Sequence, residues 1–114
     1  MKDYLFLLRG GVPMTSKTEA ERKAELEAWG AYMGGLQKSG QLVGGLPIVS
    51  GGKTISAKKS SNEPVTSAKE GIIGGYLIVK ANSIDEAAKI AKGCPHIENE
   101  GNIEVREIGQ MPTP

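Results

Sequence analysis

The segment GGYLIVKA at residues 74–81 constrains the fold more than any other stretch, because it is the strongest strand signal in the chain. Its consecutive Leu, Ile and Val side chains point alternately to the two sides of a strand, which predicts burial on both faces and a central place in a sheet. The chain continues into Ser83-x-x-Glu86, a capping box that starts a helix. A buried strand followed at once by a helix predicts a domain in which helices pack on a sheet.

The other segments complete a regular order of elements. Capping boxes at Ser16 and Thr18 start a helix that ends near Ser39. Its apolar residues recur every three or four positions, as they do on one helix face: Leu26, Trp29, Met33 and Leu36. Further strands are predicted at residues 4–9, 41–43 and 102–108, and hairpin arms at 53–59 and 65–69. This order predicts an α+β fold of the ferredoxin-like βαββαβ type, with an antiparallel sheet and an inserted hairpin.

Two helices can cover only one face of such a sheet. Strand alternation assigns a mixed set of residues to the face that the helices leave open: Tyr76, Ile78, Lys80, Glu104 and Arg106. This set is too apolar for a face in water and too charged for a core. We therefore expect a homodimer that pairs through the open faces and encloses a polar cavity, since two-fold symmetry is the commonest arrangement of oligomers.

Length and composition narrow the class of protein. The 114 residues suit one domain, which we place at 1–109, with the insertion at about 50–70 and a tail at 110–114. The net charge of +1 comes with no block of one sign, which argues against nucleic acid and membrane surfaces as partners. The single cysteine cannot form an internal disulfide, and no apolar run approaches the length of a bilayer span. A cytoplasmic protein is expected.

The predicted first helix contains three glycines in its second half, Gly30, Gly34 and Gly35. Each costs about 1 kcal/mol relative to alanine in an exposed helix, so their presence needs a reason. Close packing of the helix on the sheet is the explanation that we favour. Space for a ligand beside Trp29 and Met33 is the alternative.

The only histidine and the only cysteine of the chain lie two residues apart, around Pro95. We expect Gly93 in the left-handed conformation that ends helices, while Pro95 prevents the helix from continuing. His96 is the candidate acid/base residue because imidazole titrates near neutral pH, and the competing interpretation is a surface or a hydrogen-bonding residue in the loop after the helix. Cys94 is expected to pack as a small buried side chain rather than to act as a nucleophile.

Candidate ligand-binding residues come from the open face and from the first helix. Arg106, Lys80 and Arg9 could hold a carboxylate or phosphate, because arginine donates paired hydrogen bonds to such groups. An intersubunit or surface ion pair with Glu104 is an equally good explanation. Tyr76 and Trp29 could line a pocket or belong to the core. One cysteine and one histidine are too few for a zinc site, and the glycine-rich phosphate and dinucleotide motifs are absent, so neither metal nor cofactor is expected.

The stretch GGYLIVKANSIDEAAKIAKGCPHIENEGNIEVREI, residues 74–108, resembles the C-terminal half of the YCII-related family, particularly its DGPF branch. The shared features are a Gly-Gly-aromatic strand, a Ser-x-Asp-Glu-Ala helix start, a Cys-Pro ending and a Glu-Val-Arg strand. YLFLLRGG at residues 4–11 and LVGGLPI at residues 42–48 resemble the first half of the family. The resemblance implies a dimeric α+β barrel, in which two ferredoxin-like sheets pack face to face.

The chain departs from the family at its functional motifs. Where the branch has Asp-Gly-Pro-Phe, residues 62–65 read Asn-Glu-Pro-Val, and only Pro64 and the following Lys69-Glu70 pair are retained. The acid/base dyad proposed for other members joins a histidine on the first helix to an aspartate after the second helix. Here the first helix has no histidine, and Cys94 stands near the position of that aspartate.

Two functions therefore remain open from the sequence. The first is a binding protein for a small organic molecule, held in the cavity between the sheets without a complete dyad; an anion would suit Arg106 and Lys80. The second is an enzyme that carries out proton transfer or elimination on a small organic acid, with His96 as the acid/base. The sequence does not identify the ligand in either case.

Overall fold

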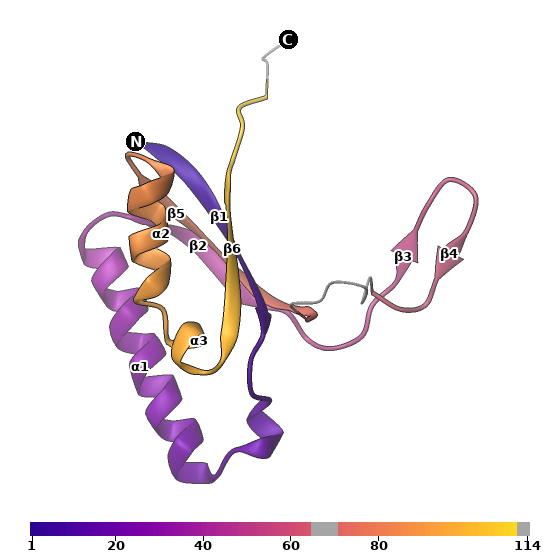
Figure 1. Cartoon of the computed structure of the whole chain (residues 1–114), viewed down its shortest axis with the longest axis horizontal. Coiled ribbons are helices and arrows are strands. Elements are labelled where there is room, and N and C mark those ends of the chain that lie inside the picture. The colour runs from indigo at the N-terminus through magenta and orange to yellow at the C-terminus, as the bar shows by residue number, and fades with distance from the viewer. Residues whose placement is uncertain (65–70, 112–114) are drawn as a thin grey trace.

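The computed structural model describes residues 1–64 and 71–111, and its elements follow the predicted order (Figure 1). The main strands are β1 (Lys2–Gly10), β2 (Leu42–Pro47), β5 (Ile73–Ala81) and β6 (Gly101–Glu107). The helices are α1 (Glu19–Lys38), α2 (Ile84–Lys92) and the short α3 (Pro95–Glu98). The smaller elements are the 3-10 turn η1 (Met14–Ser16) and the strands β3 (Thr54–Ile55) and β4 (Ser60–Ser61).

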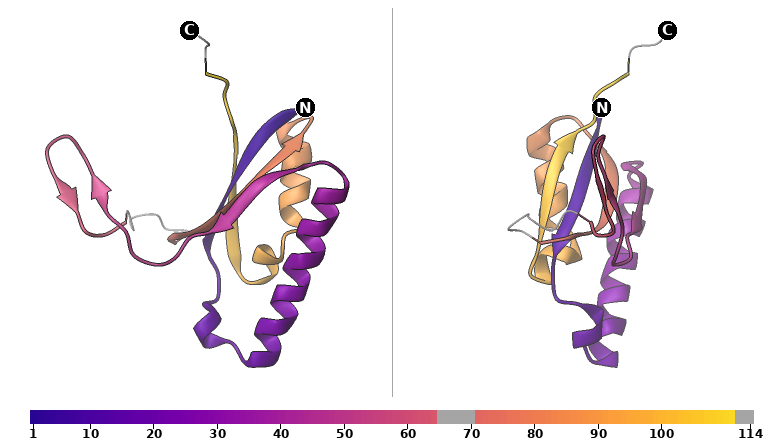
Figure 2. Two further views of the ribbon diagram at one scale, coloured as in Figure 1. Left: turned by 180° about the vertical axis from the view of Figure 1, so that it is seen from behind. Right: turned by 90° about the vertical axis from the view of Figure 1, so that its right-hand side faces the viewer.

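The main sheet has the strand order β2-β5-β1-β6, and every neighbouring pair is antiparallel. The predicted central strand β5 does lie inside the sheet, next to β1. Helices α1 and α2 cover the same face, so that the sheet stands in front of both helices in the right-hand view of Figure 2. This arrangement confirms the α+β, ferredoxin-like fold.

Strand alternation separates the core from the open face along β1. Tyr4, Phe6 and Leu8 are buried toward the helices, whereas the residues between them are partly exposed. Phe6 lies opposite Leu77 of β5 and Val105 of β6, so three strands contribute to one layer of the core. Because directly opposite residues of antiparallel strands share a face, the register places these side chains together beneath the helices.

Helix α1 begins as its sequence predicts. The side chain of Thr18 accepts a hydrogen bond from the backbone N–H of Glu21 at 3.1 Å, and the Glu21 carboxylate accepts one from the Thr18 N–H at 2.9 Å. The chain leaves the helix at Gly40, whose φ of +75° is strained for residues with a side chain. Within the described residues, neither α1 nor another helix combines the length and the apolar character that a membrane span requires.

The sequence predicted an apolar face on α1 and close packing of its glycines against the sheet. The face is confirmed in part, and the close packing is not. Leu36 is buried and Trp29 packs against the core, but Leu26 of the predicted apolar face is 63% exposed. Close packing does not explain the glycines, because a Cβ built on Gly30 or Gly34 meets no other atom within 4 Å. The same is true of the third glycine of the helix, so the favoured explanation is wrong for the chain as described.

Strands β3 and β4 form a hairpin that projects from the sheet on the side away from the helices (Figures 1 and 2). Its turn is closed by the N–H of Ser56, which donates to the carbonyl of Lys59 at 2.8 Å. Strand β4 occupies the position where we predicted a polar loop, and the predicted arm at 65–69 lies outside the described residues. Ile55 near the tip is 79% exposed.

The segment after α2 corrects the predicted helix stop. Gly93 has a φ of −82°, so it is not left-handed, and Glu100 instead has a φ of +64°. Pro95 does not only end one helix; it is the first residue of α3. His96 therefore lies in a short helix instead of the predicted loop, and at 9% exposure it is a hydrogen-bonded residue and not a surface residue.

Candidate functional site

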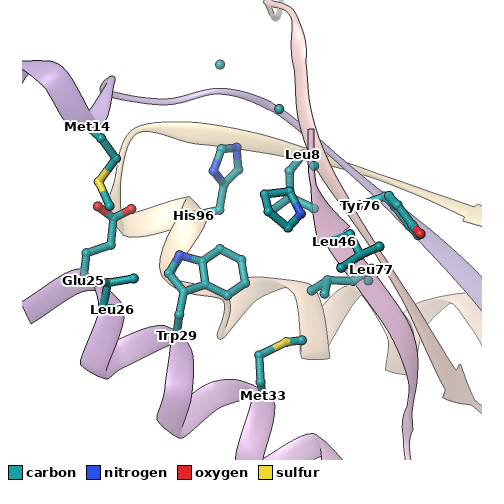
Figure 3. Close-up of a pocket in the computed structure, with 15 residues that line it drawn as sticks. Leu8, Met14, Glu25, Leu26, Trp29, Met33, Leu46, Tyr76, Leu77 and His96 are labelled. Atoms are coloured by element: carbon teal, nitrogen blue, oxygen red, sulfur yellow. The ribbon is translucent and has the colours of Figure 1, made fainter. Parts of the chain in front are cut away.

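A pocket of about 410 Å³ lies between α1 and one end of the sheet (Figure 3). Helix α1 and the sheet strands contribute most of its walls, and α3 and η1 contribute one residue each. The side chains that Figure 3 labels around it are Leu8, Met14, Glu25, Leu26, Trp29, Met33, Leu46, Tyr76, Leu77 and His96. This volume is in the range of small-molecule sites, and the walls are largely apolar, as such sites usually are.

The helical side of the pocket follows from the spacing of residues on α1. Leu26, Trp29 and Met33 recur at intervals of three and four, which places their side chains on one face of the helix. Trp29 also contacts Tyr32, with the two ring centroids 6.1 Å apart and the rings nearly perpendicular. The exposure of Leu26 therefore has a structural reason, because this side chain forms the outer wall of the pocket instead of a part of the core.

His96 is held at the base of this pocket by its own hydrogen bond. Its Nε2 lies 2.8 Å from the carbonyl oxygen of Arg9. A carbonyl can only accept, so Nε2 carries the hydrogen, and Nδ1 of the neutral ring is an acceptor. Two glycines pass close to the ring: a Cβ on Gly101 would lie 2.1 Å from Nε2, and a Cβ on Gly11 would lie 3.1 Å from Cε1.

The short helix α3 fixes the position of His96 through a second pair of contacts. The N–H of Val12 donates to the carbonyl of Asn99 at 3.0 Å, and the Asn99 side-chain amide donates to the carbonyl of Val12 at 3.3 Å. Together with the His96 bond, these contacts join α3 and its C-terminal cap to the end of β1 and the turn that follows it. The imidazole is thus part of a tight connection between α3 and β1.

Glu25 is a functional candidate that our sequence reasoning missed. It lines the pocket, and it forms an ion pair with Lys17 in which the two side chains are only 15% and 11% exposed. The signal was available, because Glu25 stands four residues before Trp29 and must share its helix face. The apolar periodicity of the helix does not include a charged residue such as Glu25, even where it shares the same face.

The remaining predicted site residues lie on the open face of the sheet. Arg106 Nη1 is 3.0 Å from Glu104 Oε2, and Arg9 Nε is 3.6 Å from Glu104 Oε1. Lys80 Nζ is 3.1 Å from the carboxylate of Asp3. The three cations therefore have carboxylate partners in the same chain, on the opposite side of the sheet from the α1 pocket.

The structure thus divides the predicted site into two groups. His96 and Trp29 line the α1 pocket together. Tyr76 also borders it, but its ring points away from Trp29 (Figure 3), because the buried Leu77 takes the helix-facing position. Arg9 connects the groups, since its side chain lies on the open face while its carbonyl accepts the hydrogen bond of His96.

Cys94 is fully buried beside the turn into α3. Burial raises the pKa of its thiol to about 11, although a hydrogen bond from the backbone of His96 lowers it in part. A thiol with a raised pKa is a poor nucleophile at neutral pH. Burial also raises the pKa of the Tyr32 phenol, whose hydroxyl donates to the carbonyl of Ile90 at 2.7 Å. Among residues 1–64 and 71–111, no three His, Cys, Asp or Glu side chains gather as a metal site would require.

The chain is similar in fold to a solved structure and matches a known family of domains. A solved structure of 5-chloro-2-hydroxyhydroquinone dehydrochlorinase from Burkholderia phenoliruptrix AC1100, in complex with 2,5-dihydroxybenzoquinone, is similar in fold. The TM-score is 0.55 at 19% sequence identity, over 96% of this chain and 95% of the other. No curated protein matches the chain in sequence. The model of the YCII-related domain matches residues 11–112, and the protein therefore belongs to the YCII-related family.

Proposed function

We propose that the protein binds a small, largely apolar organic molecule in the α1 pocket. The observation that carries the proposal is an apolar pocket of about 410 Å³ in which Glu25, Trp29 and His96 supply polar groups. A concave apolar site with a few converging polar groups is the usual architecture for binding a small molecule. The ligand-bound dehydrochlorinase with a similar fold supports small-molecule binding.

The α1 pocket is not the place where the sequence predicted the ligand. The sequence placed the ligand on the open face, with Arg106 and Lys80 as anchors. Both cations already have carboxylate partners there, at 3.0 and 3.1 Å. The α1 pocket lies on the helix-covered side and contains His96 and Trp29. We therefore assign binding to the α1 pocket and leave the cations of the open face in ion pairs.

The binding proposal is testable through Trp29, the only tryptophan of the chain. Titration with a panel of monocyclic aromatic compounds, namely benzamide, acetophenone and benzoate, should change the fluorescence emission of Trp29 in a saturable way for at least one compound. Leu26→Ala removes part of the outer wall and should weaken binding about fivefold, because less apolar surface is buried. Val43→Ala is the matched control, since Val43 is exposed outside the pocket. The absence of any saturable change would refute the proposal.

A second function, proton transfer catalysed by His96, is favoured by one specific observation. Nε2 donates its hydrogen bond to the Arg9 carbonyl, whereas Nδ1 makes no hydrogen bond within the described residues. The ring also lines the pocket. His96→Gln should keep a donor for that carbonyl and retain binding. Turnover of any bound compound should fall by at least about 100-fold, as expected for a lost acid/base group. Unchanged turnover in His96→Gln would rule out this function.

We also propose that the protein forms a homodimer through the open face of its sheet. The centre of the open face carries Leu5, Leu7 and Ile78, none of which is buried, and the β3–β4 hairpin projects on this same side (Figure 1). A second copy related by two-fold symmetry would cover these residues and lie beside the hairpin. An isolated two-stranded hairpin is marginally stable in water, so such a contact would also stabilise it. The dimeric α+β barrel that the sequence resemblance to the YCII-related family implies supports this proposal.

A further inference from the structure

The polar groups of the α1 pocket indicate which chemical class of ligand it accepts, an inference that rests on the proposed binding function. Three of them surround one end of the pocket in Figure 3: Glu25, Trp29 and His96. Oε2 of Glu25 accepts from Lys17, and Nε2 of His96 donates to Arg9. Within the described part of the chain, Glu25 Oε1, Trp29 Nε1 and His96 Nδ1 make no hydrogen bond. None of them is a buried atom without a partner, so each is accessible to water or to a ligand.

The hydrogen-bonding capacity of these three atoms is unequal. An ionised carboxylate only accepts, an indole N–H only donates, and Nδ1 of this imidazole tautomer accepts. The pocket therefore offers two acceptors for each donor. A ligand must bring hydrogen-bond donors, such as hydroxyl or amino groups, to satisfy Glu25 and His96. A ligand without donors would remove water from both acceptors and leave them unpaired, which costs free energy.

The charge of the pocket also disfavours anionic ligands. Glu25 is the only ionised side chain among the described residues that line it, and no lysine or arginine joins it there. Lys17, the counterion of Glu25, is only 11% exposed and is occupied by that carboxylate. An anion would enter beside Glu25 and find no free cation, and burying an unpaired charge in an apolar site is strongly unfavourable.

We propose that Glu25 is the specificity-determining residue of the α1 pocket, and that it selects uncharged ligands with hydroxyl or amino donors over organic anions. This selection is the opposite of the sequence-based expectation of an anion. Lys17 positions the carboxylate, because it binds one oxygen and leaves the other free for the ligand.

The test uses three ligands of nearly the same shape. Benzamide is uncharged and donates two N–H groups, acetophenone is uncharged and has no polar donor, and benzoate is an anion. We expect benzamide to bind at least tenfold more tightly than benzoate and about threefold more tightly than acetophenone. Dissociation constants are measured from the emission of Trp29.

Substitutions then assign the selection to Glu25. Glu25→Gln keeps the size of the side chain but removes its charge, so the benzamide to benzoate affinity ratio should fall at least fivefold. Glu27→Gln is the matched control, because it makes the same change on an exposed residue of α1 that does not line the pocket. Circular dichroism verifies folding. If Glu25→Gln does not fold, Lys17→Met provides the second variant and should increase the ratio, since the carboxylate loses its counterion.

Each outcome discriminates between the two proposals. Equal binding of benzamide and benzoate by the unmodified protein would overturn the selection and leave the binding function intact. An unchanged ratio in Glu25→Gln would overturn the role of Glu25 alone. If none of the three compounds changes the emission of Trp29, both the binding function and the selection are wrong.

Discussion

At the scale of single residues, the imidazole of His96 has very little free space around it. The ring fits between Gly11 and Gly101 and donates to the carbonyl of Arg9. The sequence identified His96 as the candidate but placed it in a loop, because a loop and a buried helical turn look alike in Cys-Pro-His. Gly101 gave no signal, since its role depends on a ring that approaches from another element.

Gly101→Ala should therefore destabilise the protein. The new methyl group would overlap Nε2 and displace the ring from the Arg9 carbonyl, at a cost of about 1–3 kcal/mol in the free energy of unfolding. Urea denaturation measures this change. Gly109→Ala is the control, because a Cβ there meets no atom within 4 Å. Equal stability of both variants would show that the ring moves aside freely.

Cys94 gives the protein a dependence on alkaline pH. The thiol has an ordinary pKa of 9.0 and a folded-state pKa of about 11, so the unfolded chain loses its proton first. The contribution of this group to the free energy of unfolding is constant below about pH 9 and falls as the pH rises toward about 11. Urea denaturation between pH 8 and pH 11 should show the fall.

Cys94→Ala provides the control for that measurement. The variant should lose part of the pH dependence and retain the part that comes from Tyr32, whose pKa is also raised by burial. A variant with the same pH profile as the unmodified protein would contradict the assignment to Cys94.

At the scale of elements, the sheet was easier to predict than the surroundings of the helices. Alternation along β1 and β5 depends only on the two-residue repeat of a strand, so the buried and open faces were predictable. The helix-facing pocket was anticipated only as the alternative explanation for the glycines of α1, namely space beside Trp29 and Met33, because its presence depends on the distance between α1 and the sheet. The glycines of α1 illustrate the same limit, since a glycine in the sequence does not reveal what lies beside it.

Two glycines in different elements should respond to alanine in opposite directions. Gly30→Ala should raise the free energy of unfolding by up to about 1 kcal/mol, because the helix gains propensity and the space is empty. Gly45→Ala should lower it, because a Cβ there would lie 2.5 Å from Leu77 Cδ2 and 2.6 Å from the carbonyl oxygen of Tyr76. Thermal and urea denaturation compare the pair. A destabilising Gly30→Ala would indicate that a partner packs on α1.

At the scale of the whole molecule, the chain is flat, with extents of 45, 44 and 21 Å. The helices cover one face of the sheet, and the hairpin projects from the opposite, open face along the longest axis of the molecule (Figure 1). The sequence predicted this asymmetry from the number of helices. It could not predict the direction of the hairpin, because β3 and β4 contact mainly each other among the residues that the structure describes.

The proposed dimer is tested by sedimentation equilibrium. The mass should be about twice the 12.0 kDa of one chain. Ile78→Lys places a charge at the centre of the open face, opposite Leu5, and should give a monomer. Ile84→Lys, on the exposed surface of α2, should leave the mass unchanged. A monomeric unmodified protein would show that the open face has another role.

The strand order has a consequence for synthesis on the ribosome. Strand β1 pairs only with β5 and β6, so residues 2–10 have no partner in the main sheet until residue 73 and those beyond it have emerged. Residues 11–72 are made while an apolar strand remains unpaired, and such edges are prone to aggregation. The nascent chain should therefore depend on chaperones early, and the pocket can be completed only after His96 has emerged.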